Sequence, residues 1–169
     1  MDEVELATRR RRRSGIVVGV TIVVVLGVFA LTPRTVASGG EDDTTWRLRI
    51  APVALGQQIS LEHAGARGSA GDSGFVRTAR LDQTAVWHVG AGDDALTIVA
   101  GPTPGGASSV RVTSEELGVG EASLHRVGWR RFHVERLRGH VEVTELVAIG
   151  TSGQVLEVMT DPPAPVRLP

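Results

Sequence analysis

The sequence predicts an all-β domain, an antiparallel β-sandwich or a barrel-like fold, preceded by one N-terminal transmembrane helix. Three observations lead to this prediction. Residues 15–31 contain no charged side chain. After residue 45, about nine short segments alternate apolar and polar residues as strands do. Clusters of glycine, proline and aspartate separate most of these segments, and none of them keeps the 3.6-residue period of a long helix.

The N-terminal segment has the charge distribution of a membrane anchor. Residues 1–14 form a basic N-terminus with five arginines in a row, and the apolar run follows directly. As a helix, residues 15–31 extend about 25 Å, close to the roughly 30 Å of a hydrocarbon core. We therefore expect a transmembrane helix over residues 15–32. The positive-inside rule then places residues 1–14 in the cytoplasm and the rest of the chain outside the cell.

A cleaved signal peptide is the alternative to a retained anchor. Thr35, Val36 and Ala37 resemble a small-residue cleavage site, and cleavage near Ala37 would release a secreted domain. The apolar run is longer than the 7 to 15 residues or so of a usual signal peptide, which favours the anchor. Gly15 and Gly19 form a GxxxG spacing, which indicates a homodimer through the span.

The remaining chain divides into a linker, a domain and a tail. Residues 33–45 are small, polar and acidic, and we expect a linker there. Residues 46–160 form the extracytoplasmic all-β domain, and its first strand has Trp46, Leu48 and Ile50 on one face. Residues 161–169 contain four prolines and predict an extended tail.

Eight further segments have strand character, and Ser114 to Leu117 holds at most one helical turn. The eight are Gln58–Glu62, Phe75–Leu81, Ala85–Val89, Leu96–Ala100, Ser109–Thr113, Arg130–Leu137, Val141–Ile149 and Gln154–Met159. In the third of these, Trp87 is expected to be buried and His88 to be exposed, because neighbouring residues of a strand face opposite ways. Asp93 and Asp94 fit a hairpin turn better than a calcium site, which needs six or more oxygen ligands.

Composition excludes several kinds of chemistry. The chain has no cysteine, lysine or tyrosine, so thiolate, Schiff-base and phenolic mechanisms are ruled out. Residues 41–169 carry 12 arginines against 16 acidic residues, which argues against nucleic acid as a partner. No motif for a cofactor is present. The use of arginine in place of lysine is typical of a bacterium with GC-rich DNA.

Two short motifs resemble known sites without their context. Gly71 to Gly74 reads GDSG, the sequence around the nucleophile of chymotrypsin-like proteases, but the single histidine upstream is only ten residues before Ser73. Gly118 to Ser123 begins like a dinucleotide-binding loop and lacks its last glycine. We interpret neither as a catalytic or cofactor site.

Residues 120–140 form the densest polar segment of the chain. As a strand, this segment would place Phe132 and Val134 on a core face. The opposite face is our candidate binding patch, and it consists of Trp129, Arg131, His133 and Glu135. Tryptophan and arginine are favoured in binding hot spots. The spacing of His125, His133 and His140 matches no compact metal motif, so no metal site is predicted.

These patterns favour a non-enzymatic role in binding, docking or sensing in a bacterial cell envelope. An envelope protein or a wall polymer would be the partner, reached through an exposed sheet face or edge strand. The alternative is a hydrolase or metal-dependent enzyme whose site would be formed by His133, His125 and Glu121. A secreted domain that binds a wall polymer is a third hypothesis.

Overall fold

The computed structural model describes residues 32–41, 44–53, 55–65, 68–92 and 95–168. The chain divides into two units, and residues 33–169 form the second, described below. No helix in the described ranges is long and apolar enough to cross a membrane. The predicted anchor lies outside these ranges apart from Thr32, as do Gly15, Gly19 and the basic N-terminus. The prediction of an all-β, mainly antiparallel domain is confirmed.

Sheet A is an antiparallel meander of four strands in the order β1-β2-β3-β4. The strands are β1 (Arg34–Glu41), β2 (Thr44–Val53), β3 (Gly56–Gly65) and β4 (Gly68–Val76). Trp46 pairs with His63 and Leu48 pairs with Leu61, so alternate residues of β2 and β3 share one buried face. The other face carries exposed residues such as Arg47.

Sheet B has five strands in the order β13-β5-β6-β10-β9. They are β5 (Ala85–Val89), β6 (Leu96–Pro102), β9 (Ser123–Val127), β10 (Arg130–Arg138) and β13 (Val166–Leu168). Only β13 runs parallel to its neighbour, β5. Strands β5 and β6 are buried along almost their whole length, as expected for strands covered on both faces.

Sheet C has four strands in the order β12-β11-β7-β8. They are β7 (Ala107–Ser114), β8 (Gly118–Glu121), β11 (Val143–Gly150) and β12 (Val155–Met159). A single 3₁₀ turn, η1 (Leu81–Gln83), connects sheet A to sheet B. Strand β12 is the last strand on its side of the sheet, so one of its edges is open.

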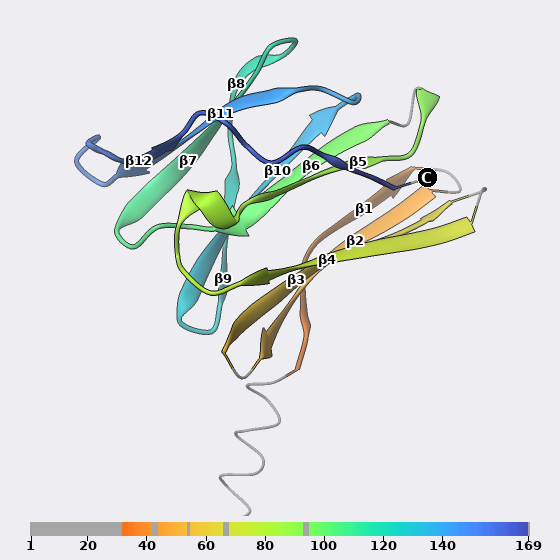
Figure 1. Ribbon diagram of the computed structural model, residues 1–169, viewed down its shortest axis with the longest axis horizontal. Coiled ribbons are helices and arrows are strands. Elements are labelled where there is room, and N and C mark those ends of the chain that lie inside the picture. Colours follow the sequence, from red (N-terminus) through yellow and green to blue (C-terminus); the bar gives the residue numbers. More distant parts are fainter. Residues whose placement is uncertain (1–31, 42–43, 54, 66–67, 93–94, 169) are drawn as a thin grey trace, which may run out of the picture. The chain divides into compact units, whose positions relative to one another are not determined.

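Sheet B lies between sheets A and C (Figure 1), and a hydrophobic cluster covers each of its faces. The first cluster joins sheets A and B and contains Trp46, Trp87 and Phe132. The second joins sheets B and C and contains Val99 and Leu146. Burying one side chain of this size stabilises the fold by roughly 1.5–3 kcal/mol. Because both faces of sheet B are covered, polar residues in the middle of its central strands, such as Thr97 and His133, are buried.

The linker expected at residues 33–45 is instead mostly strand. Residues Arg34–Glu41 form β1, and β2 already begins at Thr44. The indole of Trp46 lies against Gly39, where an added Cβ would be 2.8 Å from the indole nitrogen Nε1. Small residues therefore suit this strand because a large side chain rests on it, although such a sequence lacks the apolar alternation that predicts a strand.

The expected extended tail also joins the fold. Val166–Leu168 forms β13 beside β5, and Leu168 is buried in the first cluster. The predicted strand over Phe75–Leu81 ends at Val76, and the chain then turns into η1. Strands β8 and β9 are not predicted by the sequence, since both are short and carry few large apolar residues.

Candidate functional site

The predicted binding patch on β10 does not exist as one surface. Trp129, in the turn between β9 and β10, is 79% exposed, whereas His133 is completely buried. Arg131 is exposed and donates a hydrogen bond from Nη1 to the carbonyl of Ala107, at 3.0 Å. The prediction that His133 lies on an outer face is wrong, because sheet C covers the face of β10 that points away from Phe132.

His133 belongs to a tightly packed group inside the domain. Its Nε2 atom lies 3.2 Å from the Thr84 hydroxyl oxygen. Burial lowers the pKa of His133 to about 4, although the Pro102 carbonyl partly opposes the shift. At neutral pH the imidazole is therefore uncharged. Gly101 packs against both side chains, since an added Cβ would lie 2.6 Å from the Thr84 hydroxyl and 3.0 Å from Cε1 of His133.

Glu135 is half-buried on the same side of β10 as His133. Burial raises the pKa of Glu135, and the nearby charge of Arg136 opposes this effect. Its carboxylate lies next to Gly120, where a Cβ would be 3.3 Å from Oε1. Glu135 is therefore held between sheets B and C and does not extend the surface around Trp129.

The residues of the alternative enzymatic site do not converge. His125 pairs with Phe132 across β9 and β10, which puts it on the face opposite His133. Glu121 is exposed on β8 in sheet C, where it pairs with Arg111. Among the described residues, no group of three or more His, Asp or Glu side chains is close enough to hold a metal ion.

His88 is buried, so the prediction that it is exposed is wrong. Its ring stacks on the exposed ring of His140, with centroids 4.6 Å apart and an interplanar angle of 3°. The Nε2 atom of His88 lies 3.3 Å from the Val141 carbonyl, and that of His140 lies 3.4 Å from the Val89 carbonyl. Burial lowers the pKa of His88, and the nearby charge of His140 adds to this effect. The two stacked rings and their hydrogen bonds connect sheet B to the segment that leads into β11.

The GDSG segment lies in β4 and contributes to packing. The indole Nε1 of Trp87 donates a hydrogen bond of 2.7 Å to Oδ2 of Asp72. This bond joins sheet A to sheet B across the first cluster, which accounts for a carboxylate on the inner face of β4. Ser73 pairs with Ser60 on the outer face of sheet A, whereas His63 lies on the buried face. Asp93 and Asp94 lie outside the described residues.

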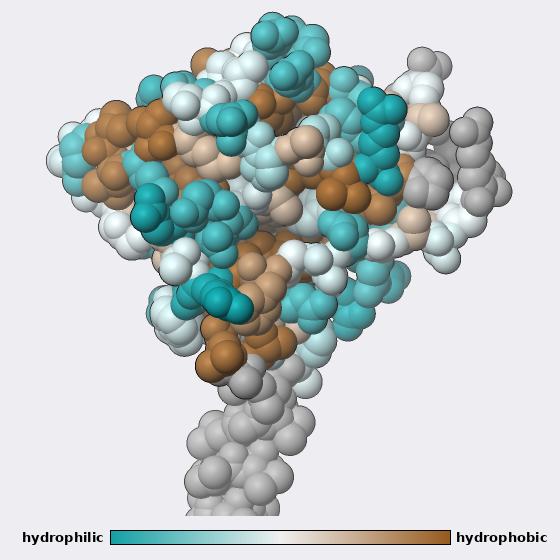
Figure 2. All heavy atoms as spheres, viewed as in Figure 1, coloured by the Kyte–Doolittle hydropathy of each residue, from teal (hydrophilic) through white to brown (hydrophobic). Residues whose placement is uncertain are grey.

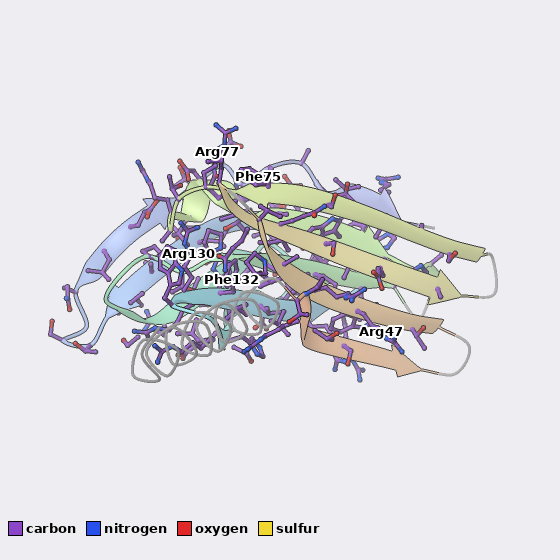
Figure 3. All side chains as sticks on the ribbon, turned by 90° about the horizontal axis from the view of Figure 1, so that it is seen from below. Arg47, Phe75, Arg77, Arg130 and Phe132 are labelled. Atoms are coloured by element: carbon purple, nitrogen blue, oxygen red, sulfur yellow. The ribbon has the colours of Figure 1, made fainter. Side chains whose placement is uncertain are left out.

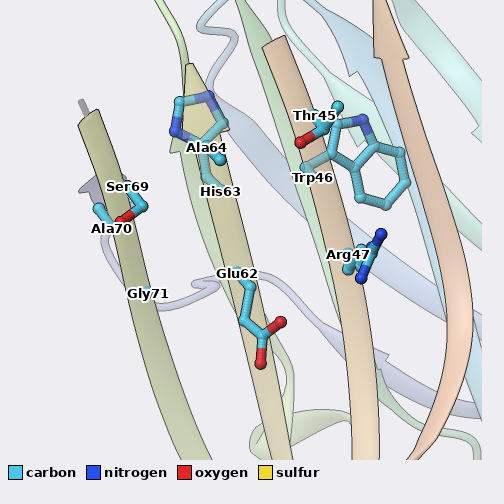
Figure 4. A pocket seen from close by; sticks show the side chains of 9 residues that line it. All are labelled: Thr45, Trp46, Arg47, Glu62, His63, Ala64, Ser69, Ala70 and Gly71. Carbon is cyan, nitrogen blue, oxygen red and sulfur yellow. The ribbon is translucent and has the colours of Figure 1, made fainter. Parts of the chain in front are cut away.

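A hollow of about 580 Å³ lies at the end of sheet A distant from the β2–β3 turn (Figure 4). Its lining residues are Thr45, Trp46, Arg47, Glu62, His63, Ala64, Ser69, Ala70 and Gly71. Trp46 and His63 are almost fully buried, and burial lowers the pKa of His63. Oε1 of Glu62 accepts a hydrogen bond of 3.1 Å from Nη1 of Arg49, with which it forms an ion pair. Glu62 and the Ser69 hydroxyl lie on the face of sheet A opposite His63, so the acid, base and nucleophile of the lining are not directed at one point.

Aromatic and arginine side chains gather where sheet A meets the β9–β10 turn, and all of them are exposed except Arg130, which is half-buried. The guanidinium of Arg130 lies over the Trp129 ring, 4.4 Å from its centre, and that of Arg77 lies 5.4 Å from the centre of Phe75. Arg130 also donates a hydrogen bond of 2.9 Å from Nη2 to the Arg77 carbonyl. Figure 3 shows Phe75 beside Arg77, with Arg47 distant from both.

Leu55 extends this group of residues. It is 81% exposed and precedes Gly56, where an added Cβ would lie 3.0 Å from Cζ of Phe75. We call the set of Leu55, Phe75, Arg77, Trp129 and Arg130 the entry-end patch, because Pro33, the first residue of the unit, leads into β1 at the same end. Only Trp129 is expected from the sequence. The sequence signal that could have identified the other members is an aromatic residue followed closely by arginine at a strand end. It occurs in FVR (residues 75–77) and in WRR (residues 129–131).

A second exposed apolar surface lies on β12. Val155, Leu156 and Val158 are 60%, 39% and 47% exposed. The charged residue of this strand, Glu157, accepts hydrogen bonds from the Leu81 backbone N–H at 3.2 Å and from Arg80 at 3.4 Å. Its carboxylate is therefore directed at η1, and the open edge of sheet C presents aliphatic side chains.

No protein-family model, curated protein or solved structure matches this chain. The function is therefore argued from the two exposed surfaces and from the predicted anchor alone.

Proposed function

We propose that the chain is a membrane-anchored, extracytoplasmic and non-enzymatic docking domain of a bacterial cell envelope. Its partner is an extended apolar segment of an envelope protein, which adds as a strand to β12. The observation that carries this proposal is the open edge of sheet C with its exposed aliphatic residues. Strand addition satisfies the free backbone groups of an edge, and side-chain pockets on either face supply specificity.

Three of the other outer strands in the described sheets are less suited to this role. Strands β1, β4 and β8 are rich in glycine and serine, so they offer few apolar side chains to a partner. Natural sheets protect an open edge with charges or proline, and β12 contains neither on its exposed side. On the outer face, Val158 pairs with Val147 of β11, which widens the apolar surface beside the edge.

The position of β1 supports a retained anchor over a cleaved signal. Cleavage near Ala37 would cut within β1, after the residue that pairs with Leu48. Val36 and Ala37 also pack against the first hydrophobic cluster. Release at this point would remove half of an edge strand and expose the buried face of β2. Intact mass tests this directly, since a retained anchor gives the full-length mass in alkali-washed membranes, and cleavage gives a mass that begins near Ser38.

Docking at β12 is tested by site-specific photo-crosslinking of the full chain in its native membranes. A photoreactive residue at Val158 should give one discrete adduct, and the same residue at Ser73, on the outer face of sheet A, should give none. Leu156→Pro should abolish the adduct, because proline removes a backbone donor and disrupts strand pairing. An absence of adduct at Val158, or an equal adduct at Ser73, would show that β12 is not the docking strand.

A further inference from the structure

The β2–β3 turn projects beyond the point where the chain enters the domain. Arg34, at the start of β1, pairs with Ile50 of β2. Strand β2 then continues for three residues to Val53, which carries it about 10 Å further toward the same end. The exposed Leu55 follows in the turn. The end of the domain that receives the chain is therefore formed by this turn and by what packs beside it.

The rest of the entry-end patch lies at the same level. Phe75 and Val76 at the end of β4 pair with Gln58 and Gln57 at the start of β3. Arg77 follows directly, and its carbonyl accepts the hydrogen bond from Arg130 of the neighbouring hairpin. This hydrogen bond connects the Phe75 and Arg77 end of sheet A to the β9–β10 hairpin that carries Trp129. Figure 2 shows hydrophobic residues next to hydrophilic ones at the lower end of the described part.

The charge of this end has one sign. The four segments that meet here are residues 32–35, 52–58, 73–78 and 124–132, and they contain no aspartate or glutamate. They contain five arginines: Arg34, Arg77, Arg126, Arg130 and Arg131. The ion pairs found within the described ranges involve none of these five. The rest of the domain holds the acidic residues, so the positive charge is local.

The short connection to the predicted anchor determines what this end can face. This step rests on the proposed anchor, whose apolar run ends at Leu31. Three Cα-to-Cα steps of 3.8 Å separate Leu31 from Arg34, so Arg34 lies within about 11 Å of the end of the span. The β2–β3 turn projects about the same distance past Arg34. A chain of this length brings the turn to the lipid surface.

We propose that the entry-end patch rests on the membrane and binds anionic phospholipid headgroups. Arg77 and Arg126, which are both exposed, contact lipid phosphates, for which the planar guanidinium is well suited. The half-buried Arg130 instead holds the Trp129 ring and the Arg77 carbonyl in place. Trp129 and Leu55 enter the boundary between headgroups and acyl chains, where amphipathic aromatic residues are favoured. The domain is thereby held in one orientation, with β12 free to meet its partner.

Tryptophan fluorescence of the full chain in vesicles tests the contact. Trp129 is the one exposed tryptophan of three, because Trp46 and Trp87 are buried, and Trp129→Phe supplies their background. The vesicles contain phosphatidylcholine with phosphatidylglycerol and carry brominated acyl chains as the quencher. We expect quenching of Trp129 that weakens in pure phosphatidylcholine. It should also weaken in high salt, which screens exposed charges.

The charge contribution is measured with a pair of matched double variants. Arg77→Gln with Arg126→Gln should lower the ratio of docked to undocked domain roughly fivefold for each arginine removed. Arg47→Gln with Arg111→Gln removes the same charge from exposed strand positions elsewhere and should leave quenching unchanged. A urea unfolding curve for each variant shows whether the domain is still folded. The salt dependence of quenching is measured on the unchanged chain, so it tests the charge contribution even if a variant fails to fold.

Three results would overturn the proposal. The first is a Trp129 emission that stays unquenched in the anionic vesicles, and the second is an equal effect of the two double variants. The third is a chain that alkali extracts from the vesicles, since the reason for placing this end at the lipid would then be lost. Alkali extraction reports on the anchor alone, so it separates failure of the proposed anchor from failure of the patch.

Discussion

Two aromatic residues three positions apart, Trp129 and Phe132, occupy opposite environments. Trp129 is 79% exposed at the tip of the β9–β10 hairpin, and Phe132 is completely buried between sheets A and B. His133, next to Phe132, is equally buried on the other side of the strand. The two ends of one short segment therefore differ in role: the interior part holds three sheets together, and the tip belongs to a surface.

This difference shows how far the alternation of polar and apolar residues can be trusted. In a sheet with one exposed face, a histidine between Phe132 and Val134 would point to solvent. In sheet B it points into the second cluster, where Thr84 and Gly101 surround it. A polar residue at the centre of β10 thus lies in the interior of a layered domain, whereas Arg131 and Arg136, nearer the two ends of the strand, are exposed.

The largest expected effect separates the two aromatic residues directly. Phe132→Ala should reduce the free energy of unfolding by about 3–5 kcal/mol, because it leaves a cavity in the first cluster. Trp129→Ala should change it by less than about 0.5 kcal/mol, since the ring is mostly exposed. Urea unfolding of the full chain in mild detergent measures both. A loss of several kcal/mol for Trp129→Ala would mean that the hairpin tip is structural.

Acid should lower the free energy of unfolding, because the buried His133 is uncharged in the folded protein. The unfolded chain takes up a proton with a pKa of about 6.5, whereas the folded chain does so only near 4. Stability is therefore complete above about pH 6.5 and falls as the pH drops toward 4, by about 3 kcal/mol in total. His63 and His88 add to this fall, because burial lowers the pKa of both.

The matched variants for this prediction are His133→Gln and His125→Gln. Glutamine at position 133 can still bond Thr84 but does not titrate, so the unfolding midpoint should depend less on pH between 6.5 and 4. His125 is only partly buried, and His125→Gln should keep the pH dependence of the unchanged chain. If both variants have the same pH profile, then His133 does not control acid stability.

A smaller effect is expected from crowding around His133. Gly101→Ala forces a methyl group against Thr84 and His133, and we expect a loss of about 1–3 kcal/mol. Gly74→Ala is the control, since no atom lies within 4 Å of the added Cβ, and it should stabilise by about 0.4–1 kcal/mol. Thermal unfolding of the two variants compares them, and shifts in the same direction would contradict the packing around Gly101.

Much of the fold follows from local pattern. The strands β2, β3, β5, β6, β7, β10, β11 and β12 contain alternating or continuous apolar residues, and each overlaps a predicted segment. Strand β1 was not predicted because it lacks alternating apolar residues. Gly39 and its neighbours are small, which leaves room for the Trp46 indole. Strand β13 was not predicted because its pairing partner, β5, lies about 80 residues earlier in the chain, and no local signal reports such a distant contact.

The residues that make up the candidate site could be predicted less well than the strands. From the sequence, Trp129 could belong either to the binding patch or to the core, and it is exposed. Arg77 and Phe75, at the same end of the domain, come from a different sheet. Which residues meet at a surface depends on how sheets pack, and the three-sheet arrangement is not encoded in any single strand. For the same reason, His125, His133 and Glu121 are near in sequence but lie on different faces or sheets.

The shared middle sheet also limits how this domain can be redesigned. In β6, Ile98 and Ala100 belong to the first cluster, while Val99 between them belongs to the second. A larger residue on one side that shifts this backbone also moves the side chains on the other. Substitutions in the two clusters are therefore not independent, and their effects should fail to add when both touch β6 or β10. A redesign would therefore have to repack both hydrophobic clusters together, because they share the backbone of sheet B.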